Sequence, residues 1–331
     1  MNLILFSCSC FANVLGLNIS SAFDSAVTIY VLIPILIIPQ LLLSGVVISF
    51  DKFNPGVGKP NGIPLLGEMM ASRWAFEAYM VTQFKDNPLE KIFYDLDQKR
   101  AMAEYKRLYY LPALESKLSY VINHREGWNI QSEENKVKPA LDLLRNELLL
   151  ESGRVEKSIP ELNKLRVGEF DSTVYLKTNE FLAILKKFYN IRSRNALVEK
   201  EKLLANLTDG KDKKVDFEKL KMEYQNNEVS NMVENKQELK RVVEWEGELV
   251  QKIYPIYFNE HRPSHFLDFR DNFYIPKKHF AGQKFDTLYF NLSIIWLMSI
   301  FLYVTLYYEL LKKGVHGFVV RRRYGGKRTG G

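Results

Sequence analysis

Cysteine is nearly absent from this sequence, and its scarcity excludes two kinds of small scaffold. Only Cys8 and Cys10 occur among the 331 residues, and both lie inside an apolar run. A Cys-x-Cys pair with no further cysteine or histidine nearby cannot supply the four ligands of a structural zinc site. Two cysteines also cannot hold together a disulfide-rich domain. Separately, a hydrophobic fraction of 47% excludes a disordered chain. We interpret both cysteines as small apolar residues that face lipid or a neighbouring helix.

Charged residues are missing from two long stretches of the chain. Residues 1–50 contain a single charged side chain, Asp24, and residues 287–308 contain none. A helix that crosses a membrane needs about 20 consecutive apolar residues. The mean hydropathy of −0.19 therefore averages apolar stretches with a strongly polar remainder. We predict membrane helices at about 1–17, 25–49 and 287–311.

A secretory signal peptide is a competing interpretation of the N-terminus. The segment lacks the basic residues that begin such peptides, and a second, longer apolar stretch follows within about ten residues. A lipoprotein signal would use Cys8, but Phe6, two residues before that cysteine, does not fit the pattern of such a signal. Both alternatives rank below a membrane helix.

The positive excess of the chain lies close to its C-terminus. Seven lysines and arginines follow Tyr308, and the rest of the chain balances at 39 basic against 39 acidic groups. Basic residues beside a membrane helix tend to stay in the cytoplasm. We therefore predict a multi-pass protein of the cytoplasmic (inner) membrane, with 51–286 extracytoplasmic and the tail 312–331 inside. Nucleic acid binding is not expected, because it requires basic residues clustered on a folded surface.

The polar residues between the last two apolar stretches predict a large helical domain. We divide them into an outer connecting segment at 51–90 and a helical extracytoplasmic domain at 91–286. A long helix or helical hairpin is expected over 215–250, and a short strand over 170–176 remains open. The predicted class is an all-α membrane protein with about three transmembrane helices and a large domain inserted between the last two.

Two fragments have part of a functional motif but lack its essential residues. The segment 56–59 contains the Gly-Lys of a phosphate-binding loop, but Phe53 and Pro60 occupy the positions that require glycine and Ser or Thr. His261 and His265 have the spacing of a zinc protease motif, but a proline lies between them and the glutamate is absent. Nothing is typical of a nucleophile elbow or a catalytic triad. We expect no metal site and no catalytic residue in this chain.

Three pieces together resemble the C-terminal half of the permease domain of ABC-2-type, G-subfamily-like ABC transporters. They are LLLSGVVISF at 41–50, ASRWAFEAYMVTQF at 71–84 and LYYELLKKG at 306–314. The resemblance covers roughly 1–90 and 270–314, and it depends on order and spacing more than on any one piece. It implies that the three apolar stretches are the fourth, fifth and sixth helices of a six-helix half.

The resemblance also implies two groups of site residues. The group at the translocation path and its outer gate is Ile37, Ile38, Leu41, Ser44, Gly45, Val46 and Val47. The group in the re-entrant outer segment is Arg73, Trp74 and Glu77. The competing interpretation makes the aliphatic members ordinary lipid-facing or helix-facing side chains.

The chain departs from the family pattern in several ways. The external insert is much longer than usual, and neither the first three helices nor a GxxxxGK[ST] motif is found in the sequence. The expected protein is therefore a fragment or a subunit without its own ATPase, and 315–331 has the composition of a non-native extension. Its implied partners are lipid, a nucleotide-binding domain that carries ATP and Mg²⁺, the remaining permease helices and a second half in a homo- or heterodimer. The alternative is a membrane-anchored helical interaction module without a transport role.

Overall fold

The computed structural model describes residues 1–48, 50, 62–124, 131–209, 217–259, 266, 268–269 and 272–316. The predicted helical character is confirmed, because 72% of the structure is helical. The two motif-like fragments at 56–59 and 261–265 lie outside the described residues, as does the tail from 317 onward. The chain divides into unit 1, which is Met1–Gln83 with Asn259–Gly331, and unit 2, which is Phe84–Phe258.

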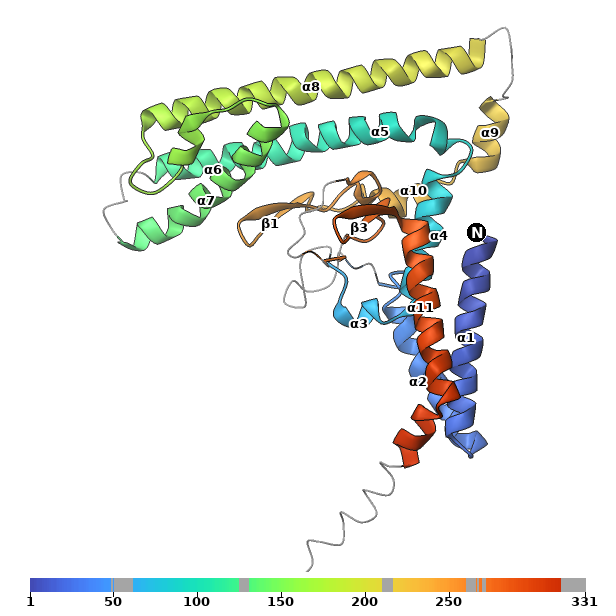
Figure 1. Ribbon diagram of the computed structural model, residues 1–331. Coiled ribbons are helices and arrows are strands. Elements are labelled where there is room, and N and C mark those ends of the chain that lie inside the picture. The colour runs from blue at the N-terminus through green and yellow to red at the C-terminus, as the bar shows by residue number, and fades with distance from the viewer. Residues whose placement is uncertain are drawn as a thin grey trace, which may run out of the picture. The chain divides into compact units, whose positions relative to one another are not determined.

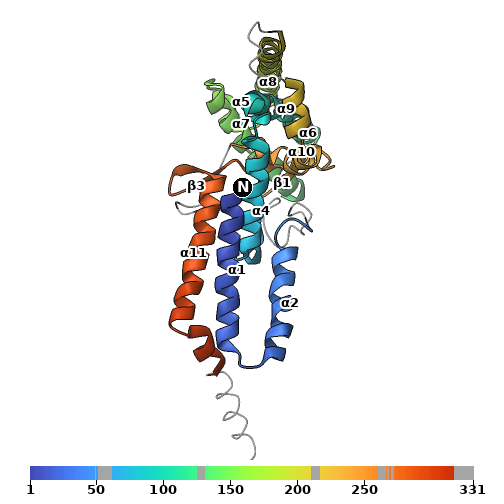
Figure 2. The same ribbon diagram turned by 90° about the vertical axis from the view of Figure 1, so that its right-hand side faces the viewer.

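Unit 1 contains three apolar helices, which run alongside one another in Figures 1 and 2. They are α1 (Asn2–Ala22), α2 (Ala26–Leu42) and α11 (Thr287–Tyr307). The short helix α3 (Leu65–Glu68) and helix α4 (Ala71–Lys85) follow α2 in the chain. A hairpin of β3 (Lys277–Phe280) and β4 (Gln283–Asp286) leads directly into α11, whose first turn is capped by Asp286 through a 3.0 Å bond from the Leu288 amide.

Two of these helices are long and apolar enough to cross a membrane. Helices α1 and α11 have 21 residues each, or about 31 Å at 1.5 Å per residue, against a hydrocarbon core of roughly 30 Å. Helix α1 is longer than the predicted 1–17, and α11 ends at Tyr307, before the predicted 311. Helix α2 is apolar but shorter, at 17 residues.

Polar side chains join α1 to α11 along their length. The Asn18 amide donates to the Leu302 carbonyl at 2.8 Å, and its oxygen accepts from the Thr305 hydroxyl at 2.9 Å. Nearer the start of both helices, Trp296 donates to the Ser7 hydroxyl at 3.1 Å. Residue numbers rise together along the interface, so the two helices are parallel.

Helix α2 ends earlier than predicted. The Ser44 hydroxyl donates to the Leu41 carbonyl at 2.7 Å and accepts from the Val46 amide at 3.1 Å, and Gly45 has a φ of 83°. These bonds and the left-handed residue stop the helix at Leu42 rather than at 49. No residue of α2 is buried, so its apolar surface is left uncovered by the described part of the chain.

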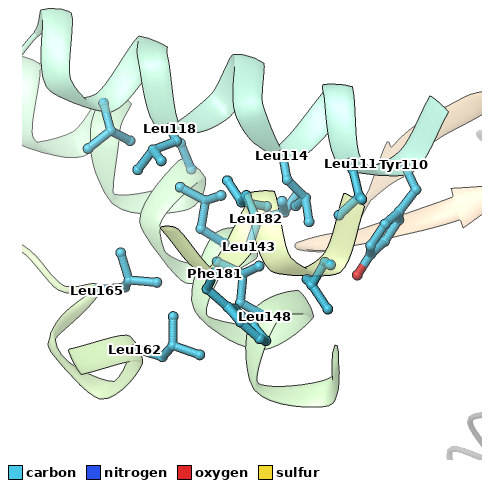
Figure 3. Close-up of a cluster of buried hydrophobic side chains, with 14 of the residues drawn as sticks. Tyr110, Leu111, Leu114, Leu118, Leu143, Leu148, Leu162, Leu165, Phe181 and Leu182 are labelled. Carbon is cyan, nitrogen blue, oxygen red and sulfur yellow. The ribbon is translucent and has the colours of Figure 1, made fainter. Parts of the chain in front are cut away.

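Unit 2 is built on long helices. Helix α8 (Ser172–Asp209) packs along α5 (Glu90–Tyr105) and α6 (Leu111–Asn123), and α7 (Gln131–Arg154) packs against α6 (Figure 1). The shorter elements are η5 (Pro160–Lys164), α9 (Phe217–Tyr224), α10 (Asn227–Glu234), β1 (Val242–Trp245), β2 (Glu248–Gln251) and η6 (Pro255–Tyr257). Figure 3 shows Leu114 and Leu118 on α6 directed toward Leu143 and Leu182, and all four are at most 2% exposed. Unit 2 therefore has a hydrophobic core of its own.

A π-helical turn, η3 (Lys106–Tyr110), joins α5 to α6 and places two polar side chains inside unit 2. Lys106 Nζ lies 2.8 Å from Glu151 Oε1, and the Tyr110 hydroxyl donates to Glu147 Oε2 at 2.8 Å. Both carboxylates are fully buried on α7. The Leu249 amide donates to Glu147 Oε1 at 2.9 Å, which attaches the β1–β2 hairpin to this network.

The two hairpins correct the prediction of an all-α chain. The hairpin β1–β2 also corrects the end of the long helix or helical hairpin expected over 215–250, whose first part is the helices α9 and α10. Glu246-Gly247 and Ala281-Gly282 form two-residue turns in which every φ is positive, between 47° and 77°. This conformation matches the twist of paired strands. Neither turn has the Asn-Gly or Asp-Gly sequence that is typical of such turns and would have predicted it. The strand considered over 170–176 is instead the start of α8, where Asp171 accepts from the Val174 amide at 2.7 Å.

Candidate functional site

The predicted path residues lie along α2 and in the segment that follows its end. The side chains of Ile37, Ile38 and Leu41 are 49%, 54% and 53% exposed. Ser44 and Gly45 are buried in the turn that ends the helix. Val46 and Val47 follow it with 49% and 62% of their surface exposed. Within the described residues, these seven positions do not enclose a path.

Gly45 could not be replaced by a larger residue without a local rearrangement. A Cβ atom at this position would lie 2.7 Å from the Phe273 ring and 2.9 Å from the Phe50 ring, and the positive φ is itself strained for other residues. Phe273 and Phe50 pack edge to face, with centroids 4.8 Å apart. The Phe273 ring also lies 5.9 Å from the Arg73 guanidinium carbon. One aromatic ring thus connects the end of α2 with the second group of predicted residues.

The second group of predicted residues is buried on α4. Arg73, Trp74 and Glu77 are at most 2% exposed. The guanidinium of Arg73 stacks on Trp74 at 3.8 Å, and its Nη1 lies 3.3 Å from Glu68 and 3.6 Å from Glu77. The indole nitrogen of Trp74 donates to the Glu68 carbonyl at 2.8 Å. These contacts fasten α4 to the end of α3.

Two residues that the sequence did not suggest complete the site. Lys278, from β3, has its Nζ 2.7 Å from Glu77 Oε1 and is buried. Asn291, from the second turn of α11, donates to Glu77 Oε2 at 2.9 Å and to the Trp74 carbonyl at 3.0 Å. We call these six residues the charge cluster: Glu68, Arg73, Trp74, Glu77, Lys278 and Asn291.

A signal for Asn291 is present in the sequence, whereas none exists for Lys278. Asn291 is the single amide side chain in the apolar run 287–308, and a polar group there requires a hydrogen-bond partner. Lys277 and Lys278 are adjacent, and a strand sends consecutive side chains to opposite faces. Only the pairing of β3 with β4 determines that Lys278 is the one turned inward.

The charge cluster is balanced, with two carboxylates, one guanidinium and one ammonium. Burial alone would raise the pKa of the Glu77 carboxyl, but the nearby charges of Lys278 and Arg73 and the bonds from Lys278 and Asn291 outweigh it, so that the pKa is lowered. An ionised, fully paired glutamate is suited to holding three elements together rather than to transferring protons. Among the described residues there is no group of three His, Cys, Asp or Glu side chains that could hold a metal ion.

An apolar groove of about 630 Å³ lies beside the cluster, between α1, α2 and α4. Ile4, Leu15 and Ile19 of α1, Ile33 and Ile37 of α2, and Ala75 and Tyr79 of α4 are among its lining residues. The Ser72 hydroxyl donates to the Gln40 carbonyl at 2.7 Å and joins α4 to α2 at one side of the groove. Ile37, one of the predicted path residues, therefore lines this groove.

Comparison with known proteins found no relative of this chain. No family model, no curated protein and no solved structure matches this chain.

Proposed function

We propose that this chain is a membrane-embedded part of an ABC-2-type permease that lacks its own ATPase and works as an exporter. In this proposal α1, α2 and α11 all cross the membrane, α4 is the re-entrant segment at the outer surface, and unit 2 is extracytoplasmic. The C-terminal end is cytoplasmic, in the inner membrane.

One observation carries this proposal: two of the pieces that resemble the family, 41–50 and 71–84, converge in space, and the helix that leads into the third is bound to the second. The Ser44-Gly45 turn packs on Phe273, the same ring lies beside Arg73 of α4, and α4 is bound to α11 through Asn291. A helix that served only as a tether would have no reason to bind α4 through a buried charge cluster, as α11 does through Asn291, because burying charges is costly unless every charge is paired.

The uncovered surface of α2 supports partners of the kind that the proposal requires. Its exposed aliphatic side chains would face lipid, the missing helices of the same half, or the second half of a homo- or heterodimer. ATP and Mg²⁺ would be held by an associated nucleotide-binding domain, on this polypeptide's continuation or on another chain. Energy from that domain would move the two permease halves between inward-open and outward-open states.

The proposal can be tested by purification from native membranes. An affinity tag is added to the C-terminus at the chromosomal gene, and the tagged protein is isolated in mild detergent. We expect a vanadate-sensitive ATPase activity in stoichiometric amount, together with a polypeptide that contains a Walker A motif. A tagged protein of this length that purifies alone and without ATPase activity would overturn the proposal.

The separate core of unit 2 favours a second candidate, a membrane-anchored interaction module. The buried side chains of α6, α7 and α8 pack among themselves, so that unit 2 needs no membrane helix to bury its apolar surface. In that case unit 2 would carry the function and the apolar helices would only retain it at the membrane. The same purification separates the two candidates, because a simple anchor brings no ATPase with it.

A further inference from the structure

Unit 2 contains a polar cavity that the proposed transport function does not use. Its volume is about 610 Å³, within the range of small-molecule sites. It lies among α5, α8, α10 and η6, and most of its lining is polar. The ionisable groups that line it are Glu90, Asp97, Arg100, Glu104, Lys200, Glu234, Lys236, Tyr254 and Tyr257.

The basic groups of this cavity are all occupied by carboxylates of the same cavity. The three pairs are Arg100 with Glu104 at 2.9 Å, Lys200 with Asp97 at 2.6 Å and Lys236 with Glu234 at 2.6 Å. Glu90, which is partly buried, is the fourth carboxylate; Lys200 and Lys236 act on its charge, but each of them is paired with another carboxylate. The described lining therefore has one unmatched negative charge.

Aromatic rings form another part of the cavity wall. Tyr257 packs against Phe84 with centroids 5.9 Å apart and against Tyr254 at 6.3 Å. Tyr254 has a φ of 60°, a left-handed conformation that is unusual for a residue with a side chain, and its amide donates to the Glu234 carbonyl at 2.7 Å. Rings beside an unmatched carboxylate provide the two features that attract an organic ammonium ion.

We propose that this cavity binds a small organic molecule through a primary ammonium group, with Glu90 as the counter-charge and Tyr254 and Tyr257 as the aromatic wall. An anionic ligand is disfavoured because every lysine and arginine of the lining already has a carboxylate partner. A metal ion is disfavoured because the described residues offer no suitable group of ligands. The proposal does not depend on the permease assignment.

The test uses three probes of nearly the same shape and different charge. Benzylamine, benzyl alcohol and benzoate are each dialysed to equilibrium against the full-length protein in nanodiscs, with empty nanodiscs as the blank. We expect saturable binding of benzylamine and at least about tenfold weaker binding of the other two, as for the loss of a charge-assisted bond. Equal binding of all three, preferred binding of benzoate, or no binding of benzylamine would each overturn the proposal.

Two variants and a matched control locate the site. Glu90→Gln keeps the shape of the side chain and should weaken benzylamine binding at least about tenfold. Lys236→Gln, at a half-exposed lysine, leaves Glu234 without its cation and should strengthen binding. The control Glu180→Gln removes a carboxylate that is 62% exposed and lies outside the cavity, and should change nothing. Unchanged affinity in Glu90→Gln protein whose thermal unfolding is like that of the parent would contradict the assignment.

Discussion

The Nζ atom of Lys278 lies 2.7 Å from the Oε1 atom of Glu77, and both side chains are at most 1% exposed. The lysine comes from a hairpin that directly precedes α11, and the glutamate comes from α4, roughly two hundred positions earlier in the chain. Unit 2 is inserted between them in the sequence. This ion pair therefore closes unit 1 around the insertion.

Removing one partner of the Lys278–Glu77 pair should be strongly destabilising. Lys278→Met leaves a buried carboxylate without its nearest cation, at an expected cost of about 3–5 kcal/mol in the free energy of unfolding. The double variant Lys278→Met/Glu77→Leu should recover much of that loss, because no unpaired charge remains. Denaturant unfolding of the purified protein in detergent measures both.

The exposed pair Lys177–Glu180 is the control, and its Met/Leu replacement should leave the unfolding midpoint unchanged. A Lys278→Met protein as stable as the parent would show that the pair does not hold unit 1 together.

Acid should weaken the charge cluster. Because the folded pKa of Glu77 is lowered, its contribution to stability is fully present above the ordinary glutamate pKa of about 4.3 and is lost as the pH falls through the lower folded value. The ionisable groups that face it are Arg73, Lys278 and, through Arg73, Glu68. Unfolding midpoints measured between pH 3 and pH 6 should fall more steeply in the parent than in Glu77→Gln. Identical profiles in the two proteins would contradict an ionised Glu77, while Glu180→Gln should follow the parent.

The polar contact of Asn18 should stabilise the pairing of α1 with α11. Asn18→Ala removes the bonds to Leu302 and Thr305, at an expected cost of about 0.6–2 kcal/mol for hydrogen bonds between membrane helices. Unfolding in a titration with sodium dodecyl sulfate measures this cost, and a double-mutant cycle with Thr305→Val isolates the side-chain pair. Ser9→Ala is a matched control, because among the described residues the Ser9 hydroxyl bonds only to Leu5 of its own helix. A cost no larger than that of Ser9→Ala would rule out a role for Asn18 in the interface.

The orientation predicted from the basic tail can be tested by cysteine labelling in intact cells. Single cysteines are introduced at Glu180 in unit 2 and at Lys313 beyond α11, in a background where Cys8 and Cys10 are replaced by serine. With the outer membrane made permeable, a membrane-impermeant maleimide should modify position 180 at once and position 313 only after the inner membrane is opened. The reverse pattern would place unit 2 in the cytoplasm and would contradict the proposed orientation.

Several elements could be predicted from local sequence because local physics determines them. A run of apolar residues as long as a bilayer is thick identifies α1 and α11. Helix α11 begins at the predicted residue, Thr287, and Asp286 directly before it is the cap. Arg73 and Glu77 could be placed together in the outer segment from the sequence. Their burial could not be predicted, because nothing near them in the sequence shows that Lys278 and Asn291 supply the missing charge and hydrogen bond.

The differences between the predicted and the observed elements also have physical causes. The hairpins β1–β2 and β3–β4 are closed by Glu-Gly and Ala-Gly, so that their turns lack the usual sequence signature, and charged strands such as Lys277–Phe280 do not alternate clearly between apolar and polar. Helix α2 was extended too far because its apolar composition continues past Ser44. The chain leaves the helix there through a left-handed glycine whose place is required by the Phe273 ring, which comes from far along the sequence.

What the sequence determined by itself was the separation of this protein into an apolar and a polar part, and the location of its positive excess in the tail. These properties depend on composition within short windows, and no tertiary contact alters them. Only the tertiary structure decided which charges are buried. A carboxylate tolerates complete burial when partners from distant elements pair with it, and the packing of α4 against α11 and the β3–β4 hairpin brings those partners to Glu77.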